Sequence, residues 1–138
     1  MSLKRLCMFL SLATPLLVAQ GCHSTAANLI EVPAPGAQAR VSTLNSGLAS
    51  DVKIVTGKSF YVDDLLEAVV TIESLEDEPL ALEVFWEFYD ADGVLMDDTT
   101  ALWRPLTLAA LASKQVKSLA PRAGAVRGRF MVRWPLED

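Results

Sequence analysis

Four aspartates lie within nine residues of one another, directly after a strongly aromatic segment. They are Asp90, Asp92, Asp97 and Asp98. Carboxylate oxygens are the ligands that hard cations such as Ca²⁺ prefer, and Asp90-Ala91-Asp92-Gly93 begins like a calcium-binding loop. The third acidic position and the distal glutamate of such a loop are missing. The pattern therefore favours an ordinary turn with solvated acids, with calcium binding as the lesser alternative, and we predict no metal centre.

The side chains that most often carry catalysis are scarce. His23 is the only histidine, and it lies directly after Cys22, outside the regular part of the sequence. The other cysteine, Cys7, belongs to the apolar N-terminal segment. Without a histidine or a free thiol in the domain, neither a Ser–His–Asp triad nor a cysteine nucleophile can be assembled. Carboxylate pairs remain possible, but a small domain offers little room for a substrate cleft. We predict a non-enzymatic protein without a cofactor.

Three arginines share one side of the alternating segment 126–134. They are Arg127, Arg129 and Arg133. Together with Trp103 they could form a face that binds an anion or an envelope glycan. The alternative is cross-strand pairing with Glu83 and Glu87, if the two strands are neighbours. Exposed pairs of this kind contribute less than about 1 kcal/mol each, and we favour the pairing.

The segment from Leu80 to Gly93 has the cleanest two-residue alternation, which is typical of a half-buried strand. Its first face is predicted to join the core and consists of Leu80, Leu82, Val84, Trp86 and Phe88. Its second face is the candidate protein interface and carries Phe85, Tyr89, Glu83 and Glu87. Aromatic side chains between charges suit an interface. Cover by the N-terminal tether or by the 97–105 loop is an equal alternative.

Shorter segments of the same kind follow one another along the chain. They are 40–44, 51–62, 66–72 and 126–134. With six to eight short strands, frequent turn residues and no strong amphipathic helix, the sequence predicts one all-β domain, an antiparallel β-sandwich spanning residues 40–138.

Some details of this arrangement follow from local patterns. The segments 66–72 and 80–90 are predicted to form a hairpin, and Gly57 is predicted to mark a bulge or bend. The segment 106–112 could be helical by propensity, but we favour a strand, a short turn and a second strand. Asn45–Gly47 is a turn signal.

The first 21 residues have the order of a secretory signal peptide: Lys4 and Arg5, then an apolar run, then a small residue before a cysteine. The apolar run is too short for a membrane-spanning helix. The sequence from Leu17 to Cys22 resembles the lipobox of bacterial lipoproteins. The resemblance implies removal of residues 1–21 and lipidation of Cys22 by several acyl chains such as palmitate. It also implies an outer-membrane location facing the periplasm, because His23 replaces the aspartate that signals inner-membrane retention. An ordinary cleaved signal is the alternative.

Residues 22–39 are rich in alanine, proline and small polar residues and are predicted to form a flexible tether. Leu29, Ile30 and Val32 could add a short edge strand, but Pro33 and Pro35 argue against a central one. Removing Lys4 and Arg5 from the 12 basic residues leaves ten against 17 acidic ones, a net charge near −7. Such a domain repels nucleic acid and anionic lipid, so the membrane contact is expected through the acyl chains on Cys22.

Three features together resemble the YcfL-like family of small bacterial lipoproteins: Phe85–Gly93, the Trp103 and 106–108 segment, and Ala120-Pro121 followed by the last strand. The resemblance covers roughly residues 50–134. It implies an immunoglobulin-like sandwich in the cell envelope and provides no catalytic residues. We therefore expect a lipid-anchored, non-catalytic module that binds another envelope protein or has a structural role. A ligand-binding or glycan-binding lipoprotein is the alternative.

Overall fold

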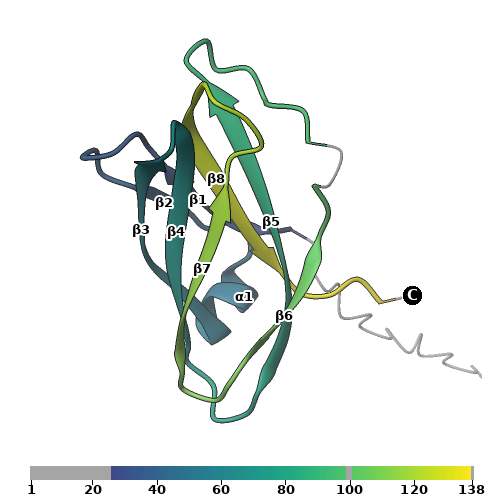
Figure 1. The fold of residues 1–138 in the computed structure, drawn as a ribbon. Coiled ribbons are helices and arrows are strands. Elements are labelled where there is room, and N and C mark those ends of the chain that lie inside the picture. Colours follow the sequence, from purple (N-terminus) through teal and green to yellow (C-terminus); the bar gives the residue numbers. More distant parts are fainter. Residues whose placement is uncertain (1–25, 99–100, 138) are drawn as a thin grey trace, which may run out of the picture.

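The computed structural model describes residues 26–98 and 101–137. Its elements, in chain order, are β1 Asn28–Val32, β2 Arg40–Ser42, α1 Ser46–Asp51, β3 Val52–Val62, β4 Leu65–Ser74, β5 Leu80–Asp90, β6 Arg104–Leu108, β7 Ser113–Leu119 and β8 Ala125–Arg133. Two antiparallel sheets pack face to face (Figure 1). The larger has the strand order β2-β1-β8-β5-β6 and the smaller β3-β4-β7. This confirms the predicted all-β, immunoglobulin-like sandwich.

Strands β5 and β8, the two most regular segments of the sequence, are neighbours in the larger sheet. Trp86 lies opposite Phe130, and Val84 lies opposite Val132. Phe130 and Val132 are buried, as are Leu82, Val84 and Phe88 on β5. The two-residue alternation therefore identified the core-facing side of both strands correctly, because one side of each faces the smaller sheet and the other faces solvent.

The predicted tether is shorter than expected, because residues 28–32 form β1, which lies inside the larger sheet between β2 and β8. Ile30 and Val32 are completely buried. The proline argument failed because Pro33 follows the last paired residue, so its missing N–H is not needed by the strand. The folded domain therefore begins no later than Asn28. The proposed signal peptide, Cys22 and His23 lie outside the described residues.

Gly57 allows β1 to lie close to β3. A Cβ atom at this position would lie 3.0 Å from Ile30 Cδ1 and 3.0 Å from Val32 Cγ2. The bulge or bend predicted at Gly57 is wrong in position, because the irregularity in the β3–β4 pairing lies between Ile54 and Thr56. The glycine is needed for close packing between the sheets and not for a bend.

The expected hairpin of β4 and β5 is wrong. β4 pairs with β3 and β7, whereas β5 pairs with β6 and β8, so the 75–79 link crosses from one sheet to the other. The segment 106–112 is strand and turn, as favoured, and β6 and β7 also lie in different sheets. An alternating segment predicts a strand, but it does not reveal which sheet the next strand joins.

The chain enters the domain beside α1. Asn45 begins this helix, and its side-chain oxygen accepts a hydrogen bond from the Leu48 N–H at 3.1 Å. The buried Asn28 side chain donates to the Asn45 carbonyl at 2.9 Å and accepts from the Asn45 N–H at 2.7 Å. The turn predicted at 45–47 is thus the start of α1. Its Asn45 is hydrogen-bonded to Asn28, the first residue of β1. Among the residues described, no helix has the length and apolar character required to cross a bilayer.

Candidate binding surfaces

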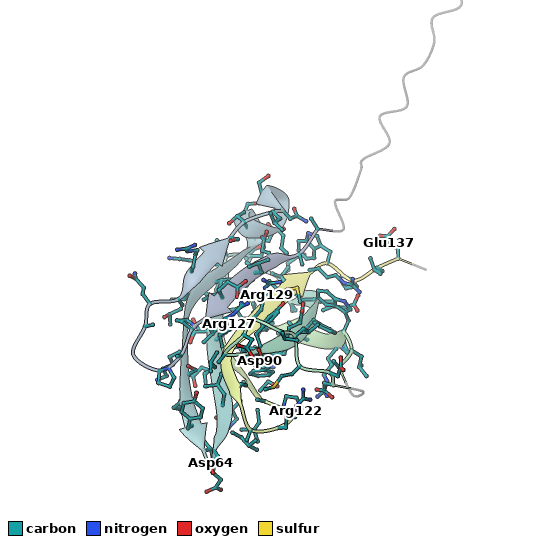
Figure 2. All side chains as sticks on the ribbon, turned by 90° about the horizontal axis from the view of Figure 1, so that it is seen from above. Asp64, Asp90, Arg122, Arg127, Arg129 and Glu137 are labelled. Atoms are coloured by element: carbon teal, nitrogen blue, oxygen red, sulfur yellow. The ribbon has the colours of Figure 1, made fainter. Side chains whose placement is uncertain are left out.

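The arginines of β8 lie on the outer face of the larger sheet, and two of them share a partner on β1. Glu31 Oε2 lies 3.0 Å from Arg127 Nη1, and Glu31 Oε1 lies 2.6 Å from Arg129 Nε. Figure 2 shows the two arginines beside each other on this face. The sequence predicts cross-strand pairing but not this partner, because Glu31 lies within residues 22–39, whose composition predicts a tether. Arg133 does pair with Glu83, at 3.6 Å.

Tyr89 lies beneath these arginines and is only 8% exposed. The guanidinium carbon of Arg127 is 4.0 Å from the centre of the ring, and that of Arg129 is 5.1 Å away, both within reach of a cation–π interaction. The Tyr89 hydroxyl donates to Glu87 Oε2 at 2.9 Å. Burial and this hydrogen bond raise the pKa of Tyr89 above its ordinary value of 10.0. Tyr89 is therefore a packed component of the sheet surface and not an exposed interface residue.

The raised pKa of Tyr89 predicts a loss of stability in alkali. A phenol with a higher pKa in the folded than in the unfolded chain stabilises the fold fully below about pH 10, and the contribution is lost as the pH rises through the folded-state value. In a Tyr61→Phe variant, Tyr89 is the only tyrosine, and phenolate absorbance should report its titration above pH 10. Tyr89→Phe should reduce the alkaline decline in the free energy of unfolding. Titration of Tyr89 below its ordinary value would contradict this prediction.

Phe85 is half-buried and is covered by the segment that precedes β6. The rings of Phe85 and Trp103 have centres 5.3 Å apart, and the Arg133 guanidinium carbon lies 3.7 Å from the centre of the Trp103 ring. Cover by the 97–105 segment was one of the two alternatives for Phe85. All three arginines and Trp103 are thus engaged within the domain, which weakens the case for an anion or glycan site at this face.

Asp90, the last residue of β5, closes the turn that follows the strand. Asp90 Oδ1 accepts hydrogen bonds from the Asp92 N–H at 2.9 Å and from the Val94 N–H at 3.0 Å, as aspartates at turns commonly do. Within residues 26–98 and 101–137, no three His, Cys, Asp or Glu side chains lie close enough to hold a metal ion. The chemistry seen at Asp90 is that of a turn.

A surface that sequence reasoning missed lies on the outer face of the smaller sheet. We call it the distal strip, and it consists of Phe60, Val62, Leu65, Val69 and Leu119. The strand register places these side chains on one face: Val62 lies opposite Leu65, and Glu67 lies between Phe60 and Leu119. Phe60 is 39% exposed, Val62 40% and Leu119 45%. No described element lies over this face (Figure 1). An uncovered apolar area on a sheet is typical of a contact surface.

Charged residues border the distal strip. Val69 is only 8% exposed and lies between Lys58 on β3 and Lys117 on β7 in the register. Glu67 lies within the strip, between Phe60 and Leu119, so exposed apolar side chains and charges are interspersed on this face. Protein–protein contacts commonly contain both kinds of residue. The sequence signal was the consecutive Phe60-Tyr61-Val62, three large apolar residues that a strand with one buried face does not need.

The distal strip lies far from the point where the chain enters the domain. Asn28, at the start of β1, is hydrogen-bonded to Asn45, which directly precedes α1 and the start of β3. Val62 is the last residue of β3 and lies at the other end of that strand. Ten residue steps of extended strand span roughly 30 Å. In Figure 2, Asp64 of the β3–β4 turn and Glu137, which follows β8, lie on opposite sides of the domain. A protein held at its N-terminus would present the strip away from the attachment point.

Comparisons with known proteins agree with the fold. A crystal structure of a DUF1425 family member from Shewanella sp. pv-4 is 27% identical, with a TM-score of 0.60, and covers 78% of this chain and 98% of its own. The structure of Campylobacter jejuni cj0090 is 19% identical, with a TM-score of 0.53, and covers 62% and 88% of the two chains. The latter similarity supports the fold alone. No curated protein matches the chain. The model of DUF1425, a protein family of unknown function, matches residues 39–134, and the chain therefore belongs to this family.

Proposed function

We propose that this protein is a lipid-anchored, non-catalytic module of the bacterial envelope that binds another protein through the distal strip. The observation that carries the proposal is the uncovered apolar surface of Phe60, Val62 and Leu119. Its position, remote from the N-terminal end of the domain, suits a partner in the periplasm better than the membrane that holds the anchor. The candidate face around Phe85 and Tyr89 is the weaker choice, because its side chains are engaged with one another.

The anchor in this proposal is Cys22, acylated after removal of residues 1–21, with the protein on the periplasmic side of the outer membrane. The lipobox-like sequence supports it, as does the resemblance to the YcfL-like lipoproteins. Six residue steps separate Cys22 from Asn28 and span at most about 20 Å. A tether this short would keep the α1 end of the domain near the lipid surface and direct the distal strip outward.

Anchoring predicts a clear effect of Cys22→Ser. Without acyl chains, the protein should move from the membrane fraction to the soluble periplasm, because several chains supply the binding free energy, at roughly 0.8 kcal/mol for each buried methylene. Fractionation with immunodetection checks this, and mass spectrometry of the N-terminal peptide of the wild type should show the acyl mass. Membrane retention of Cys22→Ser, together with an unmodified N-terminal peptide, would contradict lipidation.

Loss of the distal strip should abolish partner binding without unfolding the domain. Because both residues are about 40% exposed on edge strands, we expect Phe60→Ser with Leu119→Ser to change the free energy of unfolding by about 1 kcal/mol or less. Binding should fall at least about tenfold, because apolar residues at the centre of an interface carry most of its free energy. Crosslinking and capture from solubilised membranes, with quantification of each captured protein, measures the effect.

The matched controls are Phe85→Ser, on the opposite sheet, and Val41→Ser, whose side chain is 45% exposed on β2. Both should capture the same proteins as the wild type. If Phe85→Ser removes the partner and the strip variant does not, the interface lies on the face first predicted from sequence, and the distal strip is the wrong surface.

A further inference from the structure

Three leucines are exposed at the end of the domain where the chain enters. We call them the proximal leucines: Leu44, Leu75 and Leu111, which are 65%, 44% and 67% exposed. Leu44 precedes α1, Leu75 follows β4, and Leu111 lies in the turn between β6 and β7. Single exposed apolar residues are normal on a protein surface, whereas several that gather at one end of a domain are typical of a contact surface.

Backbone hydrogen bonds connect the segments that carry the proximal leucines. The Leu44 N–H donates to Asn28 Oδ1 at 2.9 Å, so Leu44 adjoins the first residue of β1. The Leu75 N–H donates to the carbonyl of the last residue of α1 at 2.8 Å. The Leu111 N–H donates to the Glu76 carbonyl at 2.9 Å. The three segments are therefore neighbours, and Figure 1 shows α1 and the two links in the lower half of the sandwich.

The backbone conformation at Leu111 makes a leucine at this position unusual. Its φ is +53°, in the left-handed region that glycine and asparagine adopt with the least strain. Because the residue is exposed, burial in the core does not offset that strain. Neither the turn nor the core explains a leucine here, whereas a contact outside the domain would.

The length of chain between Cys22 and β1 determines which surface the proximal leucines can meet. Six residue steps span at most about 20 Å, and Leu44 is hydrogen-bonded to the first residue of β1. In the anchored protein proposed above, these leucines lie within reach of the bilayer that holds the acyl chains. Because a short tether maintains a high effective concentration, even a weak contact with that bilayer would be populated.

The charges at this end of the domain select the kind of lipid. Every ionisable side chain of the connecting segments 43–51, 75–79 and 109–112 is acidic: Asp51, Glu76, Asp77 and Glu78. Lys53 and Lys114, in the adjoining strands, leave the acidic charges in excess. Anionic headgroups repel such a surface, because it lacks the basic cluster that attracts them. A zwitterionic surface does not.

We propose that the proximal leucines enter the headgroup region of a zwitterionic lipid surface and keep the α1 end of the domain against the membrane. Apolar side chains that enter this region add binding free energy to that of the acyl chains. The proposal rests on the proposed anchor at Cys22 and is independent of the distal strip.

Attachment of the protein to vesicles through Cys22 tests this contact without relying on acylation in the cell. The chain from Cys22 onward contains every residue that the structure describes, and Cys22 is its only cysteine. The thiol is coupled to a maleimide-bearing lipid in phosphatidylcholine vesicles, and a diazirine amino acid replaces Leu111. Illumination should give a lipid adduct, measured by mass spectrometry.

The matched control carries the same amino acid at Val94, which is 58% exposed. Val94 follows β5, whose first residue comes directly after the 75–79 link, so it lies at the other end of that strand. The adduct at position 111 should be at least about tenfold more abundant than that at position 94, because the tether keeps only the α1 end at the surface.

Substitutions separate the leucines from the tether. Leu44→Ser with Leu75→Ser should lower the adduct at position 111 at least about threefold, because two of the three apolar contacts are lost. Phe60→Ser with Leu119→Ser should leave it unchanged, and circular dichroism verifies that both variants fold. Vesicles rich in phosphatidylglycerol should give less adduct than phosphatidylcholine alone.

The proposal is overturned if positions 111 and 94 give equal adducts, if the serine pair at 44 and 75 has no effect, or if phosphatidylglycerol increases the adduct. Because the maleimide coupling takes the place of acylation, these outcomes are distinguishable from failure of the anchor, which the fractionation of Cys22→Ser tests by itself.

Discussion

A chain that begins at Ala39 should remain unfolded under conditions in which a chain that begins at Ala26 folds. The shorter chain corresponds closely to the boundary predicted from sequence, and the family match also begins at Ala39. It lacks β1, which lies between two strands of the larger sheet. Burial of Ile30 and Val32 stabilises the fold by about 1.5–3 kcal/mol each, and the backbone pairing with β8 is lost as well.

These losses are comparable to the whole free energy of unfolding of a typical domain, about 5–15 kcal/mol. The shorter chain also loses Glu31, which leaves Arg127 and Arg129 without their carboxylate. Circular dichroism and amide hydrogen exchange of the two chains test the prediction. A cooperative thermal transition in the shorter chain, similar to that of the longer one, would contradict the prediction. It would show that β1 is not needed for folding and that residues 22–39 are a tether, as their composition predicts.

Replacement of Phe130 by alanine should lower the free energy of unfolding by about 3–5 kcal/mol. Phe130 is completely buried on β8 and packs against Trp86 at 5.0 Å between ring centres. The two sheets cannot close the cavity easily, because β8 is fixed between β1 and β5. Denaturant unfolding monitored by tryptophan fluorescence gives the value.

Phe60→Ala is the matched control, because it removes the same side chain from an exposed position, and its effect should be within about 1 kcal/mol. Equal losses in the two variants would mean that Phe130 is not central to the core. The same result would contradict the assignment of Phe130 and Val132 to the side of β8 that faces the core.

The sequence was most informative where one face of a strand is buried and the other is not. The alternation in β5 and β8 identified Leu82, Val84, Phe88, Phe130 and Val132 as core residues. It also placed the arginines of β8 on the same face as the glutamates of β5. This worked because the side-chain period of a strand ties sequence position to direction.

Non-local contacts could not be predicted in the same way. β1 was underestimated because prolines follow it closely, although Pro33 lies beyond the paired residues. The β4–β5 hairpin was wrong because nothing in the short link records the change of sheet.

The central claim is that an envelope protein contacts the distal strip, and photo-crosslinking in intact cells tests it most directly. A photoreactive amino acid at Val62, in the otherwise native lipidated protein, should give one discrete adduct, which Phe60→Ser with Leu119→Ser should remove. The same amino acid at Val41 serves as the control, because Val41, on β2 of the other sheet, is 45% exposed against 40% for Val62, and it should give no such adduct. No adduct at Val62, or the same adduct from both positions, would contradict the account.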